Sequence, residues 1–485
     1  MLERLGSLEA ELPCSTGEDL GGLREQGLGR RWRRRKRVGH ERSEPPPRDE
    51  GPGNLKLSIR LRHRVDRQPE LLRERSHGWE PLTGPERSSL DEPGHLPAEL
   101  LGLGNAGAAV DAHTHASIMT RPRSRVGRYP RPSVGCGSMG VKIGVGLFTG
   151  QLPSGSSRTF ATEYRETLEL VRRAEELGFD SAWVSEHHGS SDGYLPSLLP
   201  MLAAFAAVTE RIELATGLML TPFHDPLRLA EDAAVVDQIS GGRLILGLGL
   251  GWRAEEFRMF GVPMRERAAR TVETIEVLRR AWTGSRFSFQ GEIFRYDRVK
   301  VTPPPARLGG IPIHLGGHAQ RAVRRAGQLA DGFIYIPDTG AEEEVKPALE
   351  HLAAGAREAG RDPDDIAFVW LQNTFVSRGP DALAAARSGI AHQIGAYQAW
   401  DESQDTPEHD SLEPPPPTDA ELRSSTIAGT PDQVALALER VLAPVADRRD
   451  VHLIVRLHYP GMDLASATRA LELFGREVLP ALRSG

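Results

Sequence analysis

Residues 227–252 read LRLAEDAAVVDQISGGRLILGLGLGW, and this stretch contains both halves of the repeating unit that decides the fold. Its first part, Leu227–Ile239, places apolar side chains at helical spacing, and Arg243–Gly249 is a short apolar run bounded by glycines. This run does not alternate apolar with polar residues, which is typical of a strand buried on both faces. A buried strand beside an amphipathic helix indicates a parallel sheet covered by helices.

The same succession of apolar runs and amphipathic segments extends from Val141 to the end of the chain. We expect strands at Val141–Phe148, Ser181–Ser185, Ile212–Gly217, Arg243–Gly249, Ile311–Leu315, Gly332–Ile336, Ile366–Val376 and Val451–Leu457. We expect the first helix to be capped by Thr162 and ended by Gly178, and further helices at Leu198–Thr209, Leu227–Ile239, Met264–Trp282, Ala319–Ala330, Glu342–Ala359, Asp381–Ala391, Pro431–Leu442 and Leu464–Leu482. Eight units of this kind predict a closed (β/α)₈ barrel of the TIM type. An open dinucleotide-binding sheet is less consistent, because no G-x-G-x-x-G motif follows the first strand.

Two segments interrupt the regular pattern of the predicted barrel, which spans residues 140–485. Phe287–Val301 has the pattern of a small hairpin. Trp400–Asp419, which includes Pro414–Pro417, is predicted to be a flexible insertion near residues 400–420. Long insertions on barrels usually lie at the catalytic end, so this segment is a candidate lid over the site.

Residues 1–139 have a different composition from the rest of the chain. Arg30–Arg37 reads RRWRRRKR, and Arg121–Pro132 mixes arginine with proline and glycine. Such segments bury too little apolar surface to offset the loss of chain entropy, so we expect a disordered extension. We interpret its arginine run as part of a solvated tail, and a nucleic-acid or membrane patch is the less favoured interpretation. Alternatively, the extension is not translated and the protein starts at Met139.

A possible metal motif lies within this extension. Ala108–His115 reads AAVDAHTH and resembles the first ligand motif of the amidohydrolase barrels, in which His113 and His115 would share a cation. The proline-rich segment that follows cannot form the helix that such a barrel needs next. We therefore expect no metal site.

Composition excludes several functional classes. The 485 residues carry 60 Lys plus Arg against 66 Asp plus Glu, a formal net charge of −6, which gives no electrostatic reason to expect nucleic-acid or membrane binding. The two cysteines, Cys14 and Cys136, cannot form a disulfide framework, and a reducing compartment fits best. Because the sequence also shows neither a membrane-spanning stretch nor a secretory signal, we expect a cytoplasmic protein.

Candidate catalytic groups follow the predicted strands, because barrel enzymes place their chemistry at the carboxyl ends of the strands. The second strand is followed by Glu186, His187 and His188, and imidazole can exchange protons near neutrality. The strand at Ile311–Leu315 is followed by Gly316, Gly317, His318, Ala319 and Gln320 at the start of a helix, a pattern typical of an anion-binding turn. Gly247, Gly249 and Gly251 alternate at the end of the fourth strand and would clear one of its faces for a flat ring; close packing of helices is the alternative explanation.

The combination of these motifs resembles the bacterial-luciferase-like, flavin-dependent oxidoreductases. The resemblance rests on Glu186-His187-His188, on the string AED…DQ.S.GR within residues 230–243, and on Gly251-Trp252…Glu256-Phe257…Phe260-Gly261, and it extends from about Val141 to Leu482. It implies a barrel that binds reduced FMN or a reduced deazaflavin, with His187 as the catalytic histidine and Glu186 holding its orientation. It also implies a non-prolyl cis bond at Gly217–Leu218 beside the cofactor and a phosphate seat at Gly316–Gln320.

The choice of cofactor depends on details of the resemblance. Luciferase has a Glu-Ser pair near the phosphate seat and an arginine at the position of Leu250, and this chain has neither. Deazaflavin-dependent relatives carry Asp-His where this chain has Glu186-His187, which favours FMN. The resemblance thus implies a cytoplasmic monooxygenase that uses reduced FMN and molecular oxygen to oxidise a small organic substrate, supplied with flavin by a separate reductase and assembled as a homodimer. The alternatives are a deazaflavin-dependent dehydrogenase or reductase and a non-catalytic flavin-binding subunit.

Overall fold

The computed structural model describes residues 141–337, 342–379, 381–402 and 416–484. The predicted N-terminal extension, His113 and His115, both cysteines and the centre of the predicted insertion lie outside these residues. Within the described ranges, no group of histidine, cysteine, aspartate and glutamate side chains is arranged to hold a metal ion. None of the helices in those ranges is long and apolar enough to cross a membrane.

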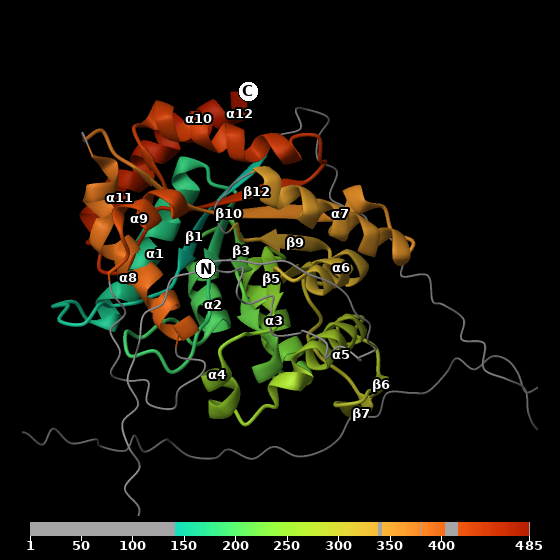
Figure 1. The fold of residues 1–485 in the computed structure, drawn as a ribbon. Coiled ribbons are helices and arrows are strands. Elements are labelled where there is room, and N and C mark those ends of the chain that lie inside the picture. Colours follow the sequence, from blue (N-terminus) through green and yellow to red (C-terminus); the bar gives the residue numbers. More distant parts are fainter. Residues whose placement is uncertain (1–140, 338–341, 380, 403–415, 485) are drawn as a thin grey trace, which may run out of the picture. The chain divides into compact units, whose positions relative to one another are not determined.

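Eight parallel strands close into a barrel, as the sequence predicts (Figure 1). They follow the order β1-β2-β3-β5-β8-β9-β10-β12, and β12 pairs with β1 to complete the ring. Their bounds are β1 Lys142–Phe148, β2 Ser181–Val184, β3 Glu213–Thr216, β5 Leu244–Gly249, β8 Ile313–Gly316, β9 Gly332–Tyr335, β10 Ala367–Val376 and β12 Val451–Arg456. Two very short strands, β4 (Met219–Leu220) and β11 (Ile427–Gly429), add to β5 and β10.

Helices surround the barrel in Figure 1, where α1 to α12 follow the colour sequence from blue-green to red. Their bounds are α1 Phe160–Leu177, α2 Leu198–Val208, α3 Pro226–Ser240, α4 Ala254–Met259, α5 Arg267–Ala281, α6 Gln320–Leu329, α7 Glu342–Glu358, α8 Ala382–Glu402, α9 Asp419–Ser425, α10 Pro431–Leu442, α11 Leu464–Leu473 and α12 Leu479–Ser484. The predicted hairpin is present as the antiparallel pair β6 (Phe287–Gln290) and β7 (Arg295–Val299) beside α5.

Two of the local predictions are wrong. Thr159, not Thr162, caps α1: its side chain accepts a hydrogen bond from the backbone N–H of Thr162, and Gly178 ends the helix in the left-handed conformation as expected. The helix predicted to end at Ala391 continues as α8 to Glu402, so Trp400 belongs to a helix and not to a flexible insertion.

The strands are mostly apolar because both of their faces are buried. Their outward side chains pack with the helices in one large core. Their inward side chains form a second, smaller core inside the barrel, made of Leu147, Trp183, Ala215, Ile245, Ile334, Val369, Leu371 and Ile454. This inner core fills the barrel, so the chemistry has to lie above it, where the strands end.

Candidate active site at the carboxyl end of the barrel

The two predicted halves of the site lie at the same end of the barrel. Glu186 and His187 follow β2, and Gly316 ends β8, and these strands belong to one parallel sheet. Leu218 lies between the two regions: a Cβ atom on Gly316 would fall 2.5 Å from Leu218 Cδ1, and one on Gly249 would fall 3.1 Å from Leu218 Cβ. The cis peptide bond expected at Gly217–Leu218 is present. Leu218 and the glycines at the ends of β5 and β8 therefore line one continuous part of the barrel mouth.

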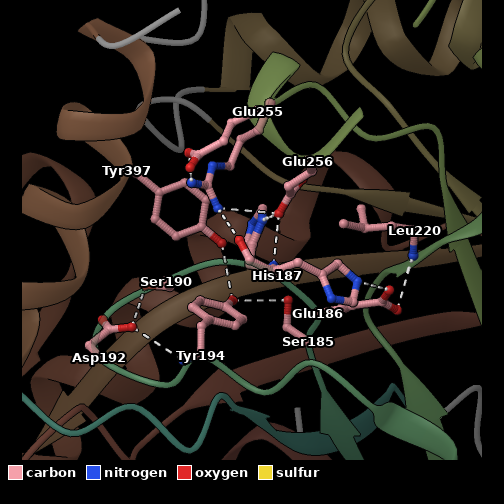
Figure 2. A network of polar contacts seen from close by, with 12 residues as sticks. Ser185, Glu186, His187, Ser190, Asp192, Tyr194, Leu220, Glu255, Glu256 and Tyr397 are labelled. Atoms are coloured by element: carbon pink, nitrogen blue, oxygen red, sulfur yellow. Dashed lines mark hydrogen bonds and ion pairs between the residues drawn. The ribbon is translucent and has the colours of Figure 1, made fainter. Parts of the chain in front are cut away.

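His187 is held by Glu256, a residue from α4. Nδ1 of His187 lies 2.9 Å from Oε1 of Glu256, and both side chains are buried (Figure 2). The same oxygen accepts from the backbone N–H of His188 at 2.9 Å and from Arg253 Nη1 at 3.3 Å. A carboxylate partner fixes the proton on Nδ1 of a neutral imidazole, which leaves Nε2 as an acceptor. No described residue hydrogen bonds Nε2, so this atom is available to a substrate.

Glu186 does not orient His187, and this part of the prediction is wrong. Its Oε1 lies 2.7 Å from His188 Nε2 and 3.2 Å from His224 Nε2, while Oε2 accepts from the backbone N–H of Leu220. Burial alone would raise the pKa of Glu186, but the hydrogen bonds from the two histidines outweigh it and lower the pKa to about 2. Glu186 is therefore an anion that ties the end of β2 to the segment after β3.

Aromatic side chains surround the imidazole of His187. Ring centroids lie 4.7 Å away for Trp400, 4.8 Å for Tyr194, 5.5 Å for Tyr397 and 6.2 Å for Trp252. The hydroxyls of Tyr194 and Tyr397 are 3.1 Å apart, and that of Tyr194 donates to Ser185. We call these four rings the aromatic box. Its walls offer flat apolar surfaces to a bound molecule.

The residues predicted to hold a phosphate surround the start of α6. Gly316 ends β8, Gly317 has a φ of 158°, and Ala319 is the N-cap of the helix that begins at Gln320. Because an alanine side chain cannot accept a hydrogen bond, it leaves the first N–H groups of α6 without the usual side-chain cap. This arrangement fits an anionic group at the helix start.

Residues 141–448 match the family described as Luciferase-like monooxygenase. The chain belongs to this family. A curated relative, the F420-dependent glucose-6-phosphate dehydrogenase of Nocardia farcinica, is 31% identical over 66% of this chain and 94% of its own length. The enzyme of the same name from Nakamurella multipartita is 30% identical over 66% of this chain and 93% of its own. Among solved structures, the monooxygenase RslO1 of Streptomyces bottropensis is 26% identical, with a TM-score of 0.60 over 70% of this chain and 99% of that one.

These similarities establish the protein as an oxidoreductase of the luciferase-like family with a flavin-type cofactor. They favour the deazaflavin alternative over the FMN-dependent monooxygenase, which was the main interpretation of the sequence.

Sequence reasoning did not assign a role to Glu256, Arg253, Tyr397 or Trp400. Glu256 stands within the Gly251-Trp252…Glu256-Phe257 string after the fourth barrel strand, and a carboxylate just past a strand end would have been the clue. The sequence pattern predicts a flexible segment at Trp400, but its ring contacts His187 and lies 4.2 Å from the guanidinium carbon of Arg253.

Proposed function

We propose that the protein is a deazaflavin-dependent oxidoreductase that exchanges a hydride with a small organic substrate, most simply by oxidising an alcohol. The observation that carries this proposal is the 30–31% identity to F420-dependent dehydrogenases over more than nine tenths of their length. Glu186 stands after β2 where deazaflavin-dependent relatives have aspartate, and this difference was the argument for FMN. The argument has little weight, because Glu186 contacts His188 and His224 and not His187.

The residues at the barrel mouth fit a tricyclic coenzyme with a phosphate. Gly249 and Gly316 let Leu218 pack directly against the ends of β5 and β8, where a ring system would lie over it, and the start of α6 can hold an anion. Gly217, Leu218, Gly316, Gly317, His318, Ala319 and Gln320 would hold the coenzyme. The deazaflavin supplies a ring carbon that accepts or gives a hydride.

His187 would act as the proton acceptor of this reaction. Its Nε2 is the free acceptor of the ring and is positioned to take the proton of a substrate hydroxyl as the adjacent carbon loses its hydride. Glu256 would hold the ring and stabilise the positive charge that forms on it. The aromatic box would exclude water during the transfer.

The second candidate is an FMN-dependent monooxygenase that uses molecular oxygen and a separate flavin reductase. Similarity to RslO1, at 26% identity, supports it. Both candidates use the same barrel mouth and the same histidine, and they differ in coenzyme and in oxygen consumption.

Titration of the full chain with each coenzyme separates the candidates. Without oxygen, we expect F420 to bind and its fluorescence to be quenched in a saturable way. We also expect the protein to reduce F420 in the presence of an alcohol substrate. Glucose 6-phosphate, the substrate in the relatives' name, is the first substrate to test. Oxygen consumption with reduced FMN and no turnover with F420 would replace the proposal by the monooxygenase. Binding without turnover of either coenzyme would favour a non-catalytic subunit.

A homodimer also stays a proposal. Val235 and Ile239 on α3, in the third unit of the barrel, are 45% and 53% exposed, and a dimer partner on this helix would cover them. Light scattering after size-exclusion chromatography would test it.

A further inference from the structure

Arg456 is the last residue of β12, and its position in the strand directs it into the barrel. Ile454 and His452, two and four residues earlier, have inward side chains: Ile454 belongs to the inner core, and His452 Nε2 lies 2.7 Å from Ser181 Oγ. Since side chains at alternate positions of a strand share a face, Arg456 points inward in the next layer, at the carboxyl end. Only 2% of the residue is exposed.

The guanidinium of Arg456 has no counter-charge among the described residues. Its Nε and Nη1 atoms are buried, and no described group accepts a hydrogen bond from them. Arg253, the other buried arginine of the mouth, contrasts with it, because it pairs with Glu255 and Glu256 and donates to the carbonyl of His188. An unpaired buried cation is strongly destabilising, so a site of this kind normally serves a ligand of opposite charge.

A second unsatisfied polar atom lies next to Arg456 on the neighbouring strand. Asn373 of β10 is the register partner of Arg456 and shares the inward face with Val369 and Leu371. Its Oδ1 atom is buried without a hydrogen-bond donor. The ends of β12 and β10 thus place two hydrogen-bond donors, Nε and Nη1 of Arg456, next to one acceptor, Oδ1 of Asn373, at the barrel mouth. None of these atoms has a hydrogen-bond partner among the described residues.

The polar pair lies at the same end of the barrel as the proposed catalytic histidine. Tyr397 lies 5.5 Å from the ring of His187. Arg456 ends β12 and His187 follows β2, and β1 alone lies between these two strands in the barrel. A molecule with its reactive carbon near His187 can therefore reach Arg456 across the carboxyl end of β1.

We propose that Arg456 binds an oxyanion of the substrate, a carboxylate, phosphate or sulfonate, while Asn373 accepts a hydrogen bond from a neighbouring hydroxyl of the same substrate. The planar fork of arginine matches two oxygens of such a group. This inference rests on the proposed function and names its substrate class. The phosphate of the coenzyme is expected elsewhere, at the turn after β8, which β9 and β10 separate from β12 in the barrel.

The oxyanion site is tested by measuring the melting temperature of the full chain with inorganic phosphate, sulfate or acetate. Chloride keeps the ionic strength constant in every sample. The scans are repeated with saturating deazaflavin to occupy the turn after β8. We expect at least one of the three anions to raise the melting temperature of the wild type by several degrees in a saturable way. Arg456→Met should lose this shift and, without anion, should melt at the same temperature as the wild type or above it.

Two further variants control the experiment. Arg449→Met removes an exposed arginine that pairs with Asp362 and Asp365 at the other end of β12, and it should keep the full shift. Arg456→Lys keeps the charge and should show a shift that needs a higher anion concentration. An equal shift in the wild type and Arg456→Met, or no shift in the wild type with any of the three anions, would overturn the proposal.

Coenzyme binding separates a substrate site from a cofactor site. Fluorescence titration with F420 should give the same Kd for Arg456→Met and the wild type within about twofold, and a tenfold weaker Kd would assign Arg456 to the coenzyme and overturn the inference. If the wild type itself does not bind F420, the proposed function fails, while the anion-dependent shift without coenzyme still reports on Arg456.

Discussion

Oε1 of Glu256 lies 2.9 Å from Nδ1 of His187, although 69 positions separate the two residues in the chain. The carboxylate comes from α4, directly after the end of β5, and the imidazole comes from the end of β2. The same oxygen accepts a hydrogen bond from Arg253 Nη1, so the carboxylate of Glu256 interacts with both a histidine and an arginine. This contact sets the orientation of the proposed proton acceptor.

Glu256→Gln should lower kcat by roughly 10- to 100-fold, less than the 10²–10⁴-fold typical of removing an acid–base group itself. The amide retains the size of the side chain but loses the charge that stabilises a protonated imidazole and fixes its tautomer. Coenzyme Kd and substrate KM should change little, because Glu256 acts through His187. Steady-state kinetics beside F420 titration measures this split.

Glu255→Gln is the matched control for this prediction. Glu255 contacts Arg253 at 2.9 Å and is 45% exposed, but it does not contact His187. Its kcat should stay near that of the wild type, and Glu256→Asp should recover part of the lost rate. Equal rates for the glutamine variants at 255 and 256 would show that Glu256 does not position the histidine.

His187→Ala should reduce turnover by about 10²–10⁴-fold while F420 still binds. The side chain provides the only imidazole acceptor proposed for the substrate proton, and the coenzyme is expected to be held by the glycine turn and not by this ring. The measurement is single-turnover reduction of F420 together with its fluorescence titration. Wild-type turnover in this variant would remove His187 from the mechanism.

The barrel was predictable from the sequence because its strands are buried on both faces. Each of the eight predicted strands is present within a few residues, since an apolar run between turn residues has few alternative structures. Strands β4 and β11 were missed because two or three residues carry no recognisable pattern. The end of α8 was missed because Gly395 and the polar residues around it weaken the helical pattern, and the helix there is stabilised by contacts of Tyr397 and Trp400.

The location of the site was predictable from the sequence, but the contacts between its residues were not. The position of Glu186 and His187 after a strand was enough to place them at the barrel mouth. Which carboxylate contacts His187 depends on the path of the chain after β5, and nothing near residue 187 indicates Glu256. Arg456 was equally hidden, because the run VHLIVRL has the composition of an ordinary buried strand.

Glu186→Gln should make the melting temperature depend less on pH in the acid range. The pKa of Glu186 is lowered to about 2 in the folded protein, below the value of 4.5 for a free side chain, so its ionisation stabilises the fold above pH 4.5. This contribution, about 3 kcal/mol at most by linkage, is lost as the pH falls from 4.5 through 2. The melting temperature of the variant should therefore lie well below that of the wild type at pH 6, and the gap should narrow towards pH 3.

Glu231→Gln provides the control for the pH experiment, because Glu231 is 47% exposed and lies 4.0 Å from its partner Arg228. Its melting temperature should follow the wild type across the whole range. A gap between Glu186→Gln and the wild type that stays constant from pH 6 to pH 3 would contradict the low pKa of Glu186.

Gly316→Ala should weaken coenzyme binding by roughly tenfold, or about 1.4 kcal/mol. A methyl group at this position would lie 2.5 Å from Leu218 Cδ1, so the leucine has to move into the space expected to hold the ring system. Since the end of a leucine side chain can shift, the fold should tolerate the change, with a melting temperature within a few degrees of the wild type.

Gly395→Ala in α8 is the control, because its added methyl meets no atom within 4 Å; it should stabilise the helix by about 0.5–1 kcal/mol and leave the Kd unchanged. Unaltered F420 affinity in Gly316→Ala would move the coenzyme away from the end of β8.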